Sequence, residues 1–167
     1  MPVAVNGPAD LRAIVETAVA NQAAGREQPF ATVERATGRV VGSTRFLNIE
    51  PAHRRLEIGY TWLAPPWQKT ALNSEAKLLM MAHAFEQLGA QRVEFKTDAL
   101  NEPSRRALLG IGAVEEGIFR SHMIVQAGRL RDSAYYSVIA SEWQAVRAHL
   151  QARVSRLSEA AETAAKS

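Results

Sequence analysis

Apolar residues recur along the first part of the chain at the spacing of one helix and then two strands. From Asp10 to Ala24 they return every three or four residues, with Asp10 placed to cap a helix and Gly25 to end it. The runs Pro29 to Glu34 and Val40 to Ile49 are rich in Val, Thr and Phe, and the turn residues Thr37-Gly38 separate them. We predict a helix followed by an antiparallel hairpin.

A third strand and a long helix follow the hairpin. The segment Arg55 to Leu63 alternates, which predicts two faces: Leu56, Ile58 and Tyr60 on one, Glu57, Gly59 and Thr61 on the other. Pro65 and Pro66 stop this strand, because proline has no N–H to donate to a neighbouring strand. A helical pattern then runs from Asn73 to Leu88, and Gly89 is its expected terminator.

The remainder of the chain alternates between strands and helices. The predicted elements are a strand at Arg92 to Thr97, a helix at Pro103 to Leu109, strands at Val114 to Val125 and Leu130 to Ile139, and a helix from Glu142, capped by Ser141, to about Leu157. This order predicts an α+β domain over residues 1–157, built around a mostly antiparallel sheet flanked by helices. Residues 158–167 are predicted to form a flexible tail.

The amino-acid composition limits the classes of protein to which the chain can belong. The chain has 167 residues, 47% of them hydrophobic, which suits a single domain with its own core. The lack of cysteine excludes disulfides and a cysteine nucleophile. A net charge of +3 mildly favours acidic ligands such as a nucleotide-bearing cofactor, and no run approaches the roughly 18 apolar residues of a membrane span. We expect a soluble, cytoplasmic protein with no nucleic-acid or membrane partner.

The connection between the third strand and the long helix is the first candidate for chemistry. After the two prolines the chain passes through Gln68 to Asn73 into the helix. A helix N-terminus offers free N–H groups and about half a positive charge, and Lys69 adds a cation, so this connection suits a phosphate or diphosphate. The alternative is an ordinary connection in which Asn73 or Ser74 only caps the helix.

Several ordered segments together resemble one family. They are Glu57-Ile58-Gly59-Tyr60, then Gln68-Lys69-Thr70-Ala71-Leu72-Asn73 with Glu75-Ala76-Lys77, then Arg92 to Asp98 followed by Asn101, Ser104, Arg105 and Gly112-Ala113, and finally Glu115-Glu116-Gly117. In this order they are similar to the GNAT N-acetyltransferases, particularly the ribosomal-protein N-terminal acetyltransferase (RimJ/RimL-type) branch. The resemblance covers Phe30 to about Trp143. We expect the usual first strand and helix of the family to be lacking before it; either a partner subunit supplies them or the sequence is incomplete.

The resemblance implies the GNAT fold with acetyl-CoA as co-substrate. The pantetheine arm would enter between two splayed parallel strands, Leu56 to Leu63 and Arg92 to Thr97. The implied cofactor-binding residues are Tyr60, Thr61, Trp62, Gln68, Lys69, Thr70, Ala71, Leu72, Asn73, Asn101 and Arg105. Ala71 and Asn73 stand where the family's Q-x-x-G-x-G/A loop has glycine and glycine or alanine. Either the loop adopts φ values that alanine tolerates, or cofactor binding is weakened.

Two residues are candidates for the chemistry of transfer. Glu57 could take a proton from the amine, directly or through water; the alternative is a solvated carboxylate paired with Arg55. The resemblance implies that Ser104 hydrogen-bonds the leaving sulfur; the alternative is a helix-start hydroxyl. It also implies that Asn101 binds the pantetheine amides, although an Asn there is also ordinary turn chemistry. A backbone N–H near Tyr60 to Trp62 would polarise the acetyl carbonyl.

The histidine and aromatic residues predict no further functional site. His83 and His122 have no second ligand at helical spacing, so we expect no metal. The aromatic side chains Trp62, Trp67, Tyr135 and Tyr136 are predicted to lie in the core, with Tyr60 as the exception.

The combined prediction is an enzyme that transfers acetyl from acetyl-CoA to a primary amine, by direct attack in a ternary complex. A protein or peptide N-terminus is the preferred acceptor, and a small amine or antibiotic is the alternative. A catalytically inactive CoA-binding or oligomerising module is a second alternative, and a nucleic-acid accessory domain is a third, motivated by the basic isoelectric point. The strand edge left by the missing first segment predicts a homodimer.

Overall fold

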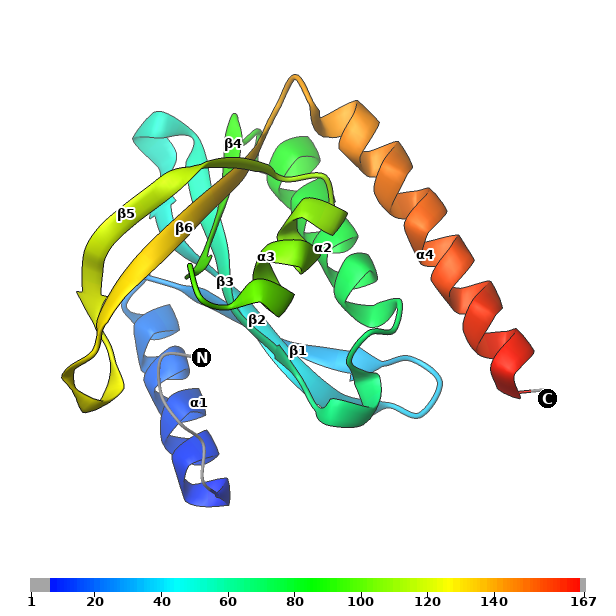
Figure 1. The fold of residues 1–167 in the computed structure, drawn as a ribbon, viewed down its shortest axis with the longest axis horizontal. Helices are drawn as coiled ribbons and strands as arrows, with labels where there is room; N and C mark the ends of the chain where they lie inside the picture. Colours follow the sequence, from blue (N-terminus) through cyan, green and yellow to red (C-terminus); the bar gives the residue numbers. More distant parts are fainter. Residues whose placement is uncertain (1–6, 166–167) are drawn as a thin grey trace.

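The computed structural model describes residues 7–165, apart from the side chains of 162, 164 and 165. A six-stranded sheet carries α2, α3 and α4 on one face, while α1 packs beside β1 (Figure 1). The main elements are α1 (Pro8–Ala23), β1 (Gln28–Glu34), β2 (Arg39–Glu50), β3 (Arg55–Leu63), α2 (Leu72–Ala82), β4 (Arg92–Asp98), α3 (Glu102–Gly110), β5 (Val114–Ile124), β6 (Leu130–Ile139) and α4 (Trp143–Ala165). The α+β prediction is confirmed.

The order of strands in the sheet is β1-β2-β3-β4-β6-β5. Every neighbouring pair is antiparallel except β3 and β4, which are parallel. The connection between these two strands runs through α2, as parallel neighbours require. The mixed, mostly antiparallel sheet is therefore the one that the order of elements predicts.

One face of the sheet holds the hydrophobic core. Val93, Phe95 and Tyr136 project from β4 and β6 toward Met81 of α2 and Leu150 of α4, and all five are at most 1% exposed. Because side chains alternate along a strand, the residues between them, such as Glu94 and Tyr135, point to the opposite face. That face carries the polar and charged side chains discussed below.

The two parallel strands separate soon after they meet. They pair at only three positions, Arg55–Glu57 opposite Arg92–Glu94. Beyond Glu57 the strands β3 and β4 diverge, and β4 continues to pair with β6 as far as Asp98. The predicted splaying of these strands is confirmed, and it leaves backbone groups of β3 facing an open space.

The predicted alternation of β3 is wrong after Gly59. The pairing of β2 with β3 shifts register between Ser43 and Arg45, and Tyr60 takes a left-handed φ of 50°. This bulge adds one residue and reverses which face the following side chains occupy. Thr61 therefore points to the helices, where its hydroxyl contacts Lys77 of α2, and Tyr60 is 38% exposed instead of following Ile58 into the core.

Two helix boundaries also differ from the pattern. The α-helical part of α2 stops at Ala82, and a π-helical turn over His83–Gln87 completes the predicted length. The last helix begins at Trp143 and continues to Ala165, so 158–165 belong to α4, whereas we predicted that the helix would end near Leu157. Residues 166 and 167 of the predicted tail lie outside the described residues. Among the helices that the structure describes, none is both long and apolar enough to span a membrane.

Candidate functional site

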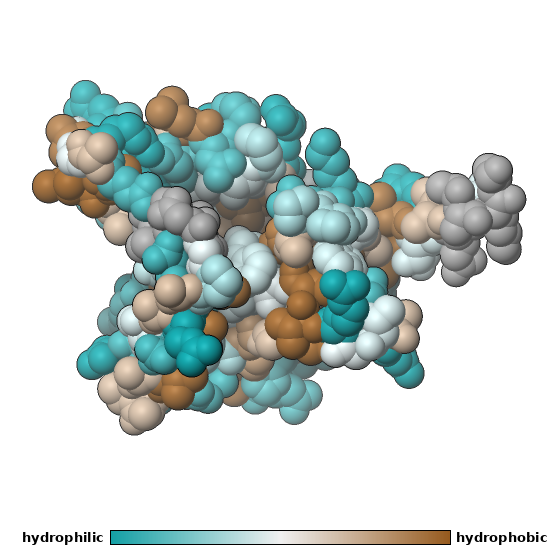
Figure 2. Space-filling view, turned by 90° about the horizontal axis from the view of Figure 1, so that it is seen from below, coloured by the Kyte–Doolittle hydropathy of each residue, from teal (hydrophilic) through white to brown (hydrophobic). Residues whose placement is uncertain are grey.

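A cleft of about 1180 Å³ opens where β3 and β4 diverge. Seen from below, the surface of the molecule is hollowed near its middle (Figure 2). Most of the predicted site residues line this cleft: Glu57, Tyr60, Thr61, Trp62, Gln68, Lys69, Asn73, Asn101 and Ser104. Thr70, Ala71, Leu72 and Arg105 do not line it. The fold thus brings together residues from β3, the connection after it, α2 and α3.

The connection Gln68 to Asn73 forms one end of the cleft. Ala71 has helical dihedrals, φ −63° and ψ −25°, so the loop adopts values that alanine tolerates. The left-handed residue is Lys69, with φ 62°. Among the described residues, the backbone N–H groups of Thr70, Ala71 and Asn73 donate to no backbone carbonyl. These free donors at the start of α2 suit an anionic group.

The alternative explanation of this connection, a simple cap, is wrong for the two residues named. Asn73 and Ser74 lie inside the first turn of α2, and no side chain caps this helix at Ala71. Thr70 instead donates its hydroxyl proton to the carbonyl of Trp67, at 2.7 Å, which holds the loop in shape. The Asn73 Oδ1 atom is buried and has no hydrogen-bond partner among the described residues.

Lys77 lies beneath the cleft, and sequence reasoning assigned it no role. It is 3% exposed, and its ammonium group donates to the hydroxyls of Thr61, at 2.6 Å, and Thr44, at 3.4 Å. Neither partner carries a charge, so burial lowers the pKa of Lys77 to about 7. This contact depends on the bulge at Tyr60, which turns Thr61 toward α2 and which the predicted alternation of β3 did not include.

Glu57 is buried rather than solvated. It is 3% exposed, and its Oε2 accepts a hydrogen bond from Asn48 Nδ2 at 2.9 Å and lies 3.4 Å from Lys96 Nζ. Among the described residues, no hydrogen bond reaches its Oε1. The predicted alternative, an exposed pair with Arg55, is wrong, because Arg55 contacts Glu50 and Glu94 instead. A carboxylate oxygen is left free at the wall of the cleft.

Asn101 and Ser104 start α3 at the other side of the cleft. Asn101 Oδ1 accepts the backbone N–H of Ser104 at 3.2 Å, so Asn101 is the N-cap of α3 and the expectation of local turn chemistry holds. Its Nδ2 group makes no hydrogen bond to the described residues. The Ser104 hydroxyl is likewise without a partner among them and borders the cleft. Both side chains keep a polar group available to a ligand.

This chain is similar in sequence to a family of known proteins. Residues 3–114 match the family model described as Acetyltransferase (GNAT) domain. This chain belongs to the GNAT acetyltransferase family. YdaF of Bacillus subtilis, a candidate ribosomal N-acetyltransferase by its name, is 33% identical over 107 residues, which are 64% of this chain and 57% of YdaF. The GNAT chain therefore spans less than two thirds of that relative's length.

Solved structures of other family members share the fold of this GNAT chain. A GCN5-related N-acetyltransferase from Brucella melitensis superposes with a TM-score of 0.82 and 35% identity, covering 89% of this chain and 66% of that one. RimJ from Mycobacterium smegmatis, in complex with CoA-disulfide, superposes with a TM-score of 0.72 and 28% identity, covering 86% of this chain and 68% of RimJ. The resemblance to the RimJ/RimL-type branch is thus confirmed.

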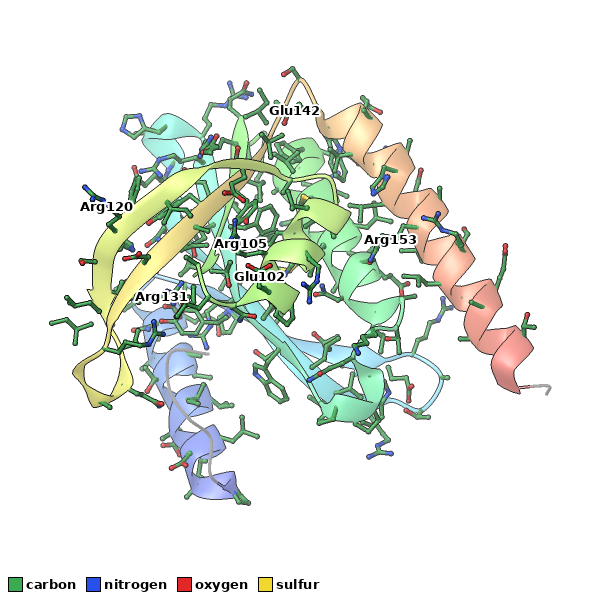
Figure 3. All side chains as sticks on the ribbon, in the orientation of Figure 1. Glu102, Arg105, Arg120, Arg131, Glu142 and Arg153 are labelled. Carbon is green, nitrogen blue, oxygen red and sulfur yellow. The ribbon has the colours of Figure 1, made fainter. Side chains whose placement is uncertain are left out.

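Arg105 is turned away from the cleft of the GNAT domain. It projects from α3, as Glu102 does (Figure 3), and its Nε donates to the hydroxyl of Tyr136 at 3.0 Å. Its Nη2 lies 3.1 Å from Glu115 of β5. These hydrogen bonds raise the pKa of Arg105 further above its usual range and lower the pKa of Glu115. In this conformation Arg105 ties α3 to the sheet.

Arg131 at the start of β6 lines the cleft and was missed by sequence reasoning (Figure 3). Its Nε is buried without a hydrogen bond, and among the described residues no carboxylate forms an ion pair with it. Its neighbour Arg129, by contrast, is paired with Asp98. The sequence around Arg131 predicts only a strand next to a turn, so no local pattern indicated that Arg131 would line the cleft.

The aromatic residues divide differently from the prediction. Tyr136 is fully buried in the core, as predicted, and Tyr60 lies outside it beneath the guanidinium of Arg45, at 4.1 Å. Trp62 and Trp67 are only half-buried and stand outside the core cluster. Tyr135 points to the face opposite α2, α3 and α4, because it alternates with Tyr136. Among the described residues, no cluster of His, Asp and Glu could hold a metal ion.

Proposed function

We propose that this chain binds acetyl-CoA in the cleft between β3 and β4 and transfers its acetyl group to a primary amine. The observation that carries the proposal is the end of β3–β4 pairing at Glu57 and Glu94, which exposes strand backbone inside a cleft lined by most of the predicted site residues. The diphosphate would lie on the free N–H groups at the start of α2, beside Lys69. The pantetheine amides would meet the backbone of β3 and Asn101.

In the proposed reaction the amine attacks the thioester directly in a ternary complex. A new N–C bond forms as the C–S bond breaks, and the amine must lose one proton while the thiolate gains one. The free Oε1 of Glu57 accepts the proton from the amine, directly or through one water molecule. Backbone N–H groups between Tyr60 and Trp62 stabilise the negative charge on the carbonyl oxygen.

Ser104 acts at the leaving group in this scheme. Its hydroxyl borders the cleft and is free of hydrogen bonds to the described residues, so it can donate to the departing sulfur. A serine hydroxyl gives up its proton reluctantly, so its contribution is a hydrogen bond to the thiolate. Loss of this hydroxyl should therefore slow turnover without abolishing it.

A protein or peptide N-terminus is our first candidate for the acceptor. The name of YdaF supports a ribosomal acceptor for that relative, and the structural likeness to RimJ points to the same branch. A small amine is the second candidate for the acceptor.

Calorimetric titration with acetyl-CoA tests the cofactor site. The parent chain should bind, and Ala71→Glu should lose binding, because a carboxylate would then face the diphosphate at the start of α2. Ala145→Glu, the same substitution at an exposed position of α4, is the control and should bind as the parent does. Absence of binding by the parent would refute the proposal and leave only the fold.

A further inference from the structure

A second, smaller cavity of about 370 Å³ lies on the face of the sheet opposite α2, α3 and α4. Its lining side chains come from β2, β3, β4, β5 and β6 and from none of the helices. Four carboxylates dominate it, and Phe119 and Tyr135, whose rings are 4.6 Å apart, form an aromatic wall. Its volume is at the lower end of the range for small-ligand sites.

This cavity, which we call the acidic pocket, adjoins the cleft at Glu57 and Asn48, the two residues that line both. The Glu57 side chain is only 4% exposed, and its Oε1 has no hydrogen-bond partner among the described residues. Glu57 lines both the cleft and the acidic pocket, so this oxygen is open to a ligand in either. A ligand in the acidic pocket would therefore approach the cleft at this oxygen.

The other charges of the acidic pocket form an alternating row. Arg55 joins Glu50 and Glu94, and Arg92 joins Glu94 and Glu116. The hydrogen bonds that Arg92 donates lower the pKa of Glu116, and those that Arg55 donates to Glu50 and Glu94 raise the pKa of Arg55, so these groups stay ionised. Three carboxylates thus outnumber two guanidiniums, and both guanidiniums are already engaged. With Glu57 and its partner Lys96 included, four carboxylates face three cations, and each cation is already paired, so one negative charge remains in excess.

We propose that the acidic pocket holds the acceptor, and that it selects an amine carrying a second positive charge and no carboxylate near the attacking nitrogen. This inference rests on the proposed function. The attacking nitrogen would lie at Glu57 Oε1, and the second cation would lie toward the alternating row. The carbon chain between them would pack on the wall formed by Phe119 and Tyr135.

Two sources share this chemistry, a free diamine and the N-terminus of a basic peptide. Steady-state kinetics with acetyl-CoA should compare putrescine, n-butylamine and γ-aminobutyrate, four-carbon amines whose far end is cationic, neutral and anionic, respectively. A second arm compares peptide amides that begin Ala-Lys or Ala-Glu. We expect kcat/KM to be higher for the cationic member than for the anionic member of a set, by about tenfold or more.

The variant Glu116→Gln removes one charge of the row and frees Arg92 toward the acidic pocket. The preference for the cationic over the anionic acceptor should then fall by about threefold or more. The matched control is Glu115→Gln, the neighbouring residue of β5, which contacts Arg105 and Tyr136 and lines neither cavity; its ratio should stay that of the parent.

The outcomes separate this inference from the proposed function. Turnover with equal or reversed preference, or an unchanged ratio in Glu116→Gln, would overturn the acidic pocket as the selective site and leave the acetyltransferase standing. The arm with the higher kcat/KM identifies the source of the amine. No turnover with any of these amines would overturn both proposals.

Discussion

Glu57 is the residue on which the proposed chemistry depends, because one oxygen is held by Asn48 and the other is free. Glu57→Gln keeps the size of the side chain and removes its ability to accept a proton. We expect kcat to fall by roughly 10²–10⁴-fold while the acetyl-CoA dissociation constant changes little. The measurements are steady-state kinetics and calorimetry, with Glu159→Gln on the exposed part of α4 as the control. A Glu57→Gln enzyme with the parent's kcat would rule out this base.

The buried Lys77 predicts how the free energy of unfolding depends on pH. Its pKa is about 7 in the folded chain and near 10.5 when unfolded, so between these values the unfolded chain binds more protons. The free energy of unfolding should therefore rise with pH across this window, by up to about 1.4 kcal/mol per pH unit. Lys77→Met should lack this rise.

Urea unfolding of the parent and of Lys77→Met between pH 7 and pH 9 measures the two slopes. Lys69→Met is the control, since Lys69 is exposed, and it should keep the parent's slope. Identical slopes in the parent and Lys77→Met would show that Lys77 is not the titrating group.

At the scale of elements, α4 packs on the rest of the domain through an apolar stripe, with polar contacts such as Arg153 to Ser74 beside it. Leu150 is fully buried, Val146 and Trp143 are nearly so, and Trp143 also donates to Glu86. Leu150→Ala should lower the free energy of unfolding by about 2–5 kcal/mol, because the cavity cannot fully collapse between α2 and α4. The control Gln151→Ala, at an exposed position, should change it by less than about 0.5 kcal/mol. A loss below about 1 kcal/mol in Leu150→Ala would contradict this packing.

At the scale of the whole molecule, β1 and β5 are the edge strands of the sheet that residues 7–165 form, and each pairs on one side only. Open strand edges can pair with another chain. We predict a homodimer of the 18.3 kDa chain at micromolar concentration, measured by light scattering coupled to gel filtration. Val33 of β1 is 48% exposed, so Val33→Lys should weaken a dimer that uses this edge. A monomer mass for the parent across the micromolar range would contradict the prediction.

The sequence by itself determined the elements and their order, because these depend on neighbours along the chain. The spacing of apolar residues located nearly every strand and helix, and the resemblance predicts a cofactor site at the connection Gln68 to Asn73. The spacing gave a wrong prediction at Tyr60, because the bulge there depends on how β3 pairs with β2, and it also gave the wrong end for α4.

Only the tertiary structure decided which groups meet, because those contacts join residues far apart in the chain. Glu57 is held by Asn48 of β2 and Lys96 of β4, not by the nearby Arg55. Arg105 turns to Tyr136 and away from the cleft. The lowered pKa of Lys77 follows from burial against the hydroxyls of two strands. Burial and partner choice are set by packing, which one-dimensional patterns do not contain.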